Sequence, residues 1–165
     1  MRQVGATPML GGIFVASDPQ SSDPLSPKDR AQRSAKAMWD GDRASAWVGM
    51  QIAAIDEGRA TLTLKIREDH CNGHGIGHGG VTFMLADSAF AFACNSRNVV
   101  TVAQHNTISF LAPVRLGDTL TATAVETTLK GRSGITDVTV TNQTGDIVAQ
   151  FRGASRALGT PLFEE

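Results

Sequence analysis

The sequence predicts an α+β fold in which an antiparallel sheet packs against one long apolar helix. Residues 81–94 are almost wholly apolar or small, with Asp87 as their only charged residue. Six other segments are rich in Val, Ile, Thr and Phe and are separated by short turns, which favours antiparallel neighbours. Because a helix that is apolar on every face is normally buried, either the sheet curls around it or a second subunit covers it.

Length and composition narrow the class of protein. The 165 residues suffice for one domain with a core of its own. The net charge of −1 argues against a general nucleic-acid-binding protein, which would carry a basic excess. No apolar run approaches the roughly 18 residues that cross a bilayer, so we expect no membrane partner. Two cysteines make no disulfide framework, and the cytoplasm is the expected location.

The domain organisation follows from local composition. Residues 1–25 mix Gly, Pro, Ser and Asp without periodicity, which predicts a flexible N-terminal extension. Residues 26–158 contain every predicted helix and strand and form the single domain. The C-terminal tail, residues 159–165, is expected to fray.

The first helix is predicted over residues 27–39. Ser26 can cap it, Pro27 suits the first helical position, and Asp29 complements the positive end of the helix dipole. A second, short helical turn is predicted over residues 42–47.

The strands form two groups, before and after the apolar helix. Residues 50–55 and 60–66 predict a hairpin around an Asp-Glu-Gly turn. The second of these strands alternates with period two, so Leu62, Leu64 and Ile66 should face the core. Four further strands are predicted over residues 99–110, 118–129, 135–141 and 147–157.

The glycine-rich segment before the apolar helix invites two interpretations that fail. His70, His74 and His78 are four residues apart, as metal ligands on one helix face would be. The glycines between them each cost a helix about 1 kcal/mol, so the segment is not helical and no metal site is predicted. Residues 75–80 formally match G-x-G-x-x-G, but no hydrophobic strand precedes them, which excludes a dinucleotide-binding loop.

Asp87 is the candidate for chemistry within the helix. Cys94 and Ser88 are better explained as core residues, because neither has the surroundings that activate a nucleophile. Asp87 is either a buried acid satisfied by a hydrogen bond or a general base or nucleophile at the wall of an apolar pocket. The glycine loop favours the second interpretation, because open N–H groups at a helix N-terminus form an oxyanion hole.

Distance separates the two halves of this site. If the helix begins at Gly79, Asp87 lies eight residues further on, about 12 Å along the axis. A reacting carbonyl needs its oxyanion donor and its attacking group each within about 3–3.5 Å. Two copies of the chain with antiparallel helices could supply both groups, which predicts a two-fold dimer with two equivalent sites.

The sequence resembles the hotdog-fold thioesterases of the phenylacetic-acid-degradation (PaaI) type. The most specific part is the H-G-G-x-x-F-x-L-A-D pattern of residues 78–87. The other resembling segments are residues 72–74, 91–96, 107–113, 117–120 and 151–153. The resemblance covers roughly residues 30–158 and leaves the N-terminal extension out.

The resemblance implies a hotdog fold, a curved antiparallel sheet wrapped around a long central helix, in dimers and usually tetramers. It implies hydrolysis of acyl-CoA thioesters, especially aryl-acetyl ones such as phenylacetyl-CoA and its hydroxylated relatives. Asp87 matches the catalytic carboxylate, which activates water or attacks directly, and Gly79 matches the oxyanion-hole glycine. Asn72 matches a polar loop residue that positions the thioester or water, and His78 has a supporting role. No cofactor is implied, because coenzyme A is part of the substrate.

The phosphates of CoA require basic groups near the pocket mouth. The candidates are Lys130, Arg132 and Ser133 around the Gly-Arg-Ser-Gly turn, with Arg115 or Arg156 as further possibilities. Each of them could equally be an ordinary solvated side chain.

Phe83, Phe90 and Phe110 are expected in the wall of the acyl pocket.

Two other functions are also compatible with the same residues. A hotdog hydratase or dehydratase would use His78 and Asp87 as a proton-transfer pair. A non-catalytic acyl-CoA-binding module would keep the pocket without the chemistry.

Overall fold

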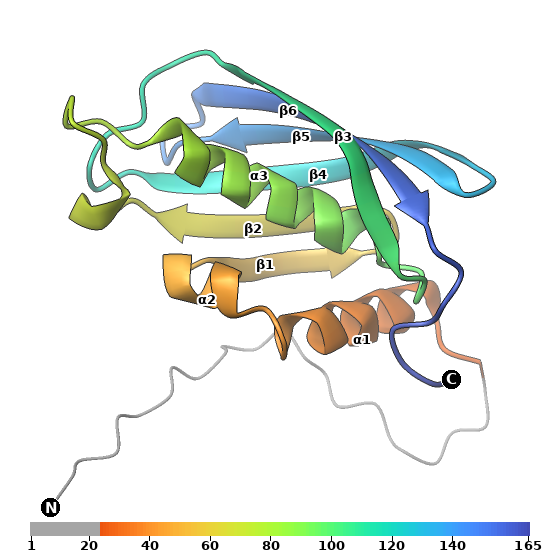
Figure 1. Cartoon of the computed structure of the whole chain (residues 1–165). Helices are drawn as coiled ribbons and strands as arrows, with labels where there is room; N and C mark the ends of the chain where they lie inside the picture. Colours follow the sequence, from red (N-terminus) through yellow and green to blue (C-terminus); the bar gives the residue numbers. More distant parts are fainter. Residues whose placement is uncertain (1–23) are drawn as a thin grey trace, which may run out of the picture.

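The computed structural model describes residues 24–165, which form a curved six-stranded antiparallel sheet wrapped around helix α3 (Figure 1). The strand order is β1-β2-β4-β5-β6-β3, so β3 forms one edge of the sheet. The predicted α+β fold is confirmed, whereas the predicted extension, residues 1–25, lies outside the described residues except for its last two. The elements are α1 (Pro27–Trp39), α2 (Arg43–Val48), β1 (Gln51–Asp56), β2 (Arg59–Lys65), a 3₁₀ turn (Glu68–His70), α3 (Gly79–Cys94), β3 (Thr101–Phe110), β4 (Thr119–Lys130), β5 (Ser133–Thr141) and β6 (Ile147–Ala157).

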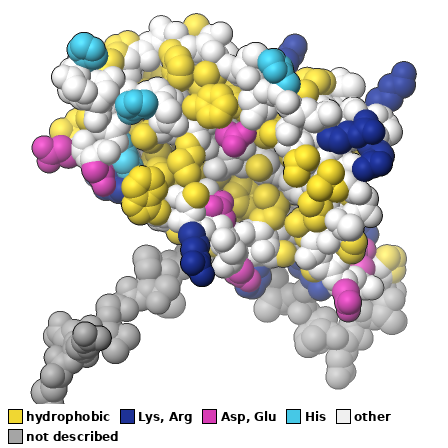
Figure 2. Space-filling model, viewed as in Figure 1, with side chains coloured by type: hydrophobic (Ala, Val, Ile, Leu, Met, Phe, Trp, Pro, Cys, Tyr) yellow, Lys and Arg dark blue, Asp and Glu magenta, His cyan; other side chains and the backbone are white. Residues whose placement is uncertain are grey.

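Helix α3 has two apolar faces, and the sheet buries only one of them. Leu85 and Ala89 face the sheet and are fully buried. Val81, Met84 and Asp87 lie on the outer side and are half-buried by the described residues. Figure 2 shows hydrophobic atoms spread over this outer face of the molecule, with acidic side chains among them. An apolar stripe left half-exposed on a helix calls for a second surface to cover it.

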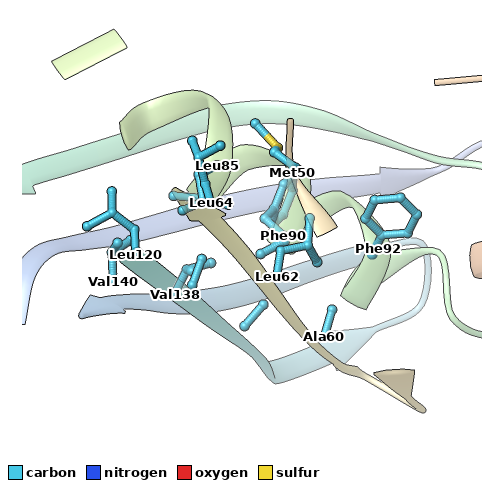
Figure 3. Close-up of a cluster of buried hydrophobic side chains, with 14 of the residues drawn as sticks. Met50, Ala60, Leu62, Leu64, Leu85, Phe90, Phe92, Leu120, Val138 and Val140 are labelled. Carbon is cyan, nitrogen blue, oxygen red and sulfur yellow. The ribbon is translucent and has the colours of Figure 1, made fainter. Parts of the chain in front are cut away.

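The core lies between α3 and the concave face of the sheet. Leu62 and Leu64 of β2 are buried, as is Ile66 directly after the strand, which confirms the predicted inward face. Figure 3 shows these leucines meeting Leu85 and Phe90 of α3 in one apolar cluster. Burial of each such side chain stabilises the fold by about 1.5–3 kcal/mol.

Side-chain caps begin both short helices, as the sequence predicts for the first. The hydroxyl of Ser26 accepts a hydrogen bond from the N–H of Asp29 (3.1 Å), and Pro27 is the first residue of α1. The carboxylate of Asp42 accepts one from the N–H of Ser45 (2.9 Å) and caps α2. No helix in the described part of the chain has the length and apolar character needed to cross a membrane.

The C-terminal tail is held in place, so the expectation that it frays after Gly159 is wrong. The side-chain carbonyl of Asn98 accepts hydrogen bonds from the N–H groups of Leu162 (2.9 Å) and Phe163 (3.0 Å). The guanidinium of Arg33 on α1 lies 4.4 Å from the centre of the Phe163 ring. Asn98 has a φ of 57°, a conformation that asparagine tolerates better than most residues. These contacts join positions far apart in the chain, which is why local composition does not predict them.

Candidate active site

Backbone hydrogen bonds, rather than a helix, fix the glycine-rich loop before α3. The N–H of His78 donates to the carbonyl of His70, and the N–H of Gly77 donates to the carbonyl of Val114, both at 2.8 Å. A Cβ on Gly77 would lie 2.8 Å from the Val114 side chain. Only glycine therefore allows the loop to approach the segment after β3 so closely.

The N-terminus of α3 presents an open backbone donor. The Nδ1 atom of His78 accepts a hydrogen bond from the N–H of Gly80 (2.9 Å) and caps the helix. The N–H of Gly79 donates to none of the described residues, and it lies at the positive end of the helix dipole. The ring of Phe110 lies over Gly79, where a Cβ would come within 3.1 Å of it. The helix start thus offers one N–H group beside an aromatic wall.

Gly79 lines a groove of about 400 Å³. Asn72 and Gly79 both line it, so the structure brings these two predicted site residues together. The side-chain carbonyl of Asn72 accepts a hydrogen bond from the N–H of His74 (2.9 Å), which orients the amide. The other lining residues are mostly apolar: Ile76, Gly77, Thr82, Phe110, Leu111, Ala112, Pro113 and Val114.

The predicted aromatic wall is only partly found. Phe110 lines the groove, but Phe90 is 1% exposed and belongs to the core, so its assignment to the wall is wrong. Its ring packs against Phe151 with 5.8 Å between the ring centroids. Phe83 also contacts the Phe151 ring, edge-on at 5.6 Å, and does not line the groove. A helix that is apolar on all sides gives no sequence cue to which phenylalanine faces the sheet.

Asp87 lies in the middle of α3 with one oxygen occupied. The side-chain N–H of Asn106 on β3 donates to its Oδ1 atom at 2.6 Å. Within residues 24–165, its Oδ2 atom accepts no hydrogen bond. Burial raises the pKa of Asp87 above its ordinary value, and the hydrogen bond from Asn106 lowers it by less. The carboxylate is thus partly desolvated, and its Oδ2 atom is open to a ligand.

Strand β3 runs along α3 and contacts both halves of the candidate site, which shows how far apart they lie. Phe110 lies over Gly79, and Asn106 contacts Asp87. Four residues of extended strand span about 13 Å, which agrees with about 12 Å for eight residues of helix. One chain therefore does not bring Gly79 and Asp87 to the same carbonyl group.

The basic candidates for CoA binding divide between the two ends of the molecule. Lys130, Arg132 and Ser133 are exposed at the β4–β5 turn, where Arg156 donates a hydrogen bond to the Ser133 hydroxyl (3.1 Å). This turn and the loop before α3 lie at opposite ends of the sheet (Figure 1). Arg115 instead belongs to the segment that bridges to that loop, beside the groove.

Histidines and cysteines do not gather into a site. His70 is buried in the 3₁₀ turn, His74 is exposed, and His78 caps α3. The structure from residue 24 onward contains no group of three His, Cys, Asp or Glu side chains arranged for a metal ion. Burial raises the pKa of Cys94 to about 12, so this thiol stays protonated and is a poor nucleophile.

Asn106 is the contact of Asp87 that sequence reasoning misses. It lies 19 positions after Asp87, in a strand whose neighbouring residues are mostly exposed. A polar residue in an edge strand is ordinary, and no motif marks this one. Only the packing of β3 along α3 reveals the contact.

Comparison with known proteins gives a consistent family. Residues 74–149 match the thioesterase superfamily. The chain is 42% identical over 136 residues to the acyl-coenzyme A thioesterase PaaI of Escherichia coli, covering 82% of this chain and 97% of that protein.

Solved structures agree with the sequence match. The structure of the E. coli PaaI protein from the phenylacetic acid degradation operon is similar with a TM-score of 0.81 and 41% identity, covering 82% of this chain and 99% of that one. A Streptococcus mutans protein bound to acetyl-CoA is similar with a TM-score of 0.66 and 26% identity, covering 68% of this chain and 91% of that one.

The capping role of His78 predicts a stability effect. His78→Ala should lower the free energy of unfolding by about 1 kcal/mol, because the N–H of Gly80 loses its acceptor. His78→Ser supplies another N-cap acceptor and should recover most of this loss. Urea denaturation of the three proteins measures the difference, and equal stability of all three would contradict the capping role.

Proposed function

Because the chain belongs to the thioesterase superfamily, as an acyl-CoA thioesterase of the PaaI type with the hotdog fold, we propose that its substrates are aryl-acetyl-CoA thioesters. The observation that carries this proposal is the open N–H of Gly79 in an apolar groove, with the desolvated carboxylate of Asp87 at a fixed distance from it. The aromatic and aliphatic lining of the groove suits a flat apolar acyl group. The similar E. coli protein comes from the phenylacetic acid degradation operon, which supports phenylacetyl-CoA as the first substrate to test.

The proposed oxyanion hole is the N-terminus of α3. The thioester carbonyl oxygen would accept a hydrogen bond from the N–H of Gly79, and Asn72 would orient the thioester or the water beside it. His78 supports this donor by capping the helix. The Nδ1 atom of His78 is occupied by this capping hydrogen bond, and His78 lies nine residues before Asp87 in the sequence. His78 and Asp87 of one chain therefore do not form the proton-transfer pair of a hydratase.

Asp87 is proposed to start the reaction in its ionised form. As a general base it would take a proton from water while the water oxygen bonds to the carbonyl carbon. The tetrahedral intermediate then expels the CoA sulfur, which takes the proton back from Asp87. Alternatively Asp87 attacks the carbonyl carbon itself, CoA leaves, and water opens the resulting anhydride. Both routes release a carboxylic acid and free CoA.

We propose that two copies of the chain form each site. In residues 24–165 nothing pairs with the outer edge of β3, although this ten-residue strand is long enough to recruit another chain. The half-exposed apolar stripe of α3 lies beside the same edge. Pairing of β3 with a second copy would extend the sheet and cover both stripes. A tetramer built from two such dimers is the assembly we propose in solution.

One register of this strand pair would complete the site. If a two-fold axis passes through Ile108, Asn106 lies opposite the partner's Phe110. Asn106 contacts Asp87, and Phe110 lies over Gly79. This register would therefore bring Asp87 level with the partner's Gly79.

The basic β4–β5 turn is the proposed contact for the CoA phosphates. In this dimer, the end of the sheet that carries Lys130, Arg132 and Ser133 would lie beyond the partner's Gly79. A thioester bound at that glycine could thus direct its phosphates toward these side chains. No cofactor is proposed, since coenzyme A arrives with the substrate. The two free thiols of the chain suit the reducing cytoplasm, which is the proposed location.

Replacement of Asp87 tests the reaction. Asp87→Asn should lower kcat for phenylacetyl-CoA by at least about 100-fold, because an amide neither accepts the proton nor attacks. A chromogenic thiol reagent measures the released CoA. In the wild type, kcat/KM should fall as the pH drops through the pKa of Asp87, which burial raises, so activity ends at a higher pH than for an exposed aspartate.

The control for this variant is Asp40→Asn, which removes an exposed carboxylate on the outer end of α1 and should leave kcat unchanged. Full activity of Asp87→Asn would contradict the proposed role. A panel of acyl-CoA substrates tests the aryl preference, with a higher kcat/KM expected for phenylacetyl-CoA than for acetyl-CoA or a long-chain acyl-CoA. Binding without any thiol release by the wild type would indicate a non-catalytic module.

Hybrid dimers test the shared site. Gly79→Pro removes the N–H donor at a helix position that tolerates proline, and the extended backbone of His78 suits a residue before proline. Asp87→Asn and Gly79→Pro should each be inactive alone. Co-expressed in equal amounts, they should regain about a quarter of wild-type activity, because half of the dimers are hybrids and one of the two sites in each hybrid is intact.

Gly79→Ala is the matched control, since it adds a Cβ near Phe110 but keeps the N–H, and it should retain most of the activity. No recovery in the co-expressed mixture, with dimers present by size-exclusion chromatography, would mean that both groups act within one chain.

Loss of the basic turn should weaken substrate binding alone. Lys130→Ala with Arg132→Ala is expected to raise KM for acyl-CoA about tenfold with little change in kcat, because phosphate contacts bind ground state and transition state equally. Lys28→Ala with Lys36→Ala removes the same charge from α1 and is the control. An unchanged KM in the first pair would show that these side chains are only solvated.

A further inference from the structure

Asn106 of β3 and Asp87 of α3 form a hydrogen-bonded polar pair where the two elements meet. The amide N–H of Asn106 donates to Oδ1 of Asp87 at 2.6 Å. The Oδ2 atom of Asp87 accepts nothing from residues 24–165. One carboxylate oxygen is therefore held, and the other is available to a water or a substrate.

The amide of Asn106 can hold Asp87 in only one orientation. With the amide reversed, its carbonyl oxygen would face the carboxylate and repel it. In the observed orientation, the Asn106 carbonyl is buried and has no hydrogen-bond partner in the described structure. An unpaired buried carbonyl costs free energy, so the arrangement gives up one hydrogen bond of Asn106 to keep the bond to Asp87.

Two features of the sheet make room for this side chain. A β-bulge interrupts the register of β3 between Ala103 and His105, just before Asn106, and bulges of this kind redirect the residues that follow. Asn106 pairs with Gly153 on β6. A Cβ on Gly153 would lie 2.9 Å from the Asn106 carbonyl oxygen and 2.6 Å from the Phe90 ring. Gly153 thus leaves the space in which the amide lies against the core.

We propose that Asn106 is a positioning residue for the thioesterase reaction, which holds Oδ1 of Asp87 so that Oδ2 meets the attacking water or the thioester. This inference rests on the proposed role of Asp87. The amide touches the catalytic carboxylate and neither the substrate nor the groove around Gly79.

The same hydrogen bond favours the ionised form of Asp87. Burial favours the protonated acid, and the donor from Asn106 opposes this by favouring the carboxylate. A lysine here would stabilise the carboxylate so strongly that it became a weak base, whereas a neutral amide stabilises it moderately. The charge of Asp87 contributes to the raised pKa of the buried Cys94 thiol, which stays protonated across the working pH range.

Asn106→Leu tests the proposal, because leucine keeps much of the volume and removes the donor. Its kcat should fall about tenfold while KM stays within about twofold of the wild type. The acidic limb of its kcat/KM profile should move to higher pH, because burial then raises the pKa of Asp87 unopposed. Thr123→Ala, exposed on β4 and away from the β3 edge, is the control and should match the wild type.

A direct titration separates this inference from the proposed function. The carboxyl carbon of Asp87, assigned by its loss in Asp87→Asn, should titrate at higher pH in Asn106→Leu than in the wild type by carbon-13 NMR. An unchanged titration together with an unchanged pH profile would overturn the positioning role while the thioesterase stands. If the wild type released no thiol, the proposed function would fail, and the NMR shift would still test the Asn106–Asp87 contact. If Asn106→Leu does not fold, as judged by thermal melting, Asn106→Ala serves in the same measurements.

Discussion

The structure depends on the burial of helix α3, which has two apolar faces but only one sheet to cover them. On the inner side of α3, Leu85 and Ala89 are fully buried against the curved sheet. Val81 and Met84 remain half-exposed on the outer side, in the same stripe as Asp87. A surface that covers this stripe would bury its apolar side chains and would also remove water from the carboxylate of Asp87. The same contact would therefore affect both the packing of α3 and the chemistry of Asp87. The long edge strand β3 has backbone groups through which a second copy of the chain could pair and cover this stripe.

The alignment of β3 with α3 gives the site its dimensions. A helix and an extended strand advance by different amounts per residue, yet eight residues of one match four of the other. Phe110 thus marks the helix start at Gly79, and Asn106 marks Asp87. Because both contacts come from one strand, the spacing of Phe110 and Asn106 along β3 matches the separation of the donor and the carboxylate along α3. In the proposed dimer, a substrate that contacts both groups would bind between the two chains, so activity would require the assembly.

Much of the fold follows from patterns that extend over only a few residues. The N-terminal cap of α1, the inward leucines of β2 and the all-apolar α3 are local features, and the sequence predicts them correctly. The errors concern contacts between distant positions. Fraying of the tail was expected because nothing near it in sequence reveals the Asn98 amide that binds it. Phe90 was expected in a pocket because an all-apolar helix does not indicate which side faces the sheet. The 78–87 motif marks Gly79 and Asp87 as candidates from the sequence, whereas the contact of Asn106 with Asp87 depends on a bulge and on a glycine in the neighbouring strand.

Assembly itself would make the Asn106 contact more necessary. In the single chain Asp87 is half-buried, and burial already raises its pKa. A second copy placed over the stripe would remove more water and favour the protonated, inactive acid further. The proposed closed site would therefore need an interaction that stabilises the carboxylate without adding a positive charge, which would weaken it as a base or attract the CoA phosphates to the wrong place. A neutral amide on the strand that would join the two copies satisfies both conditions. On this proposal, the buried, unpaired carbonyl of Asn106 is the cost of a hydrogen bond that favours the ionised form of Asp87.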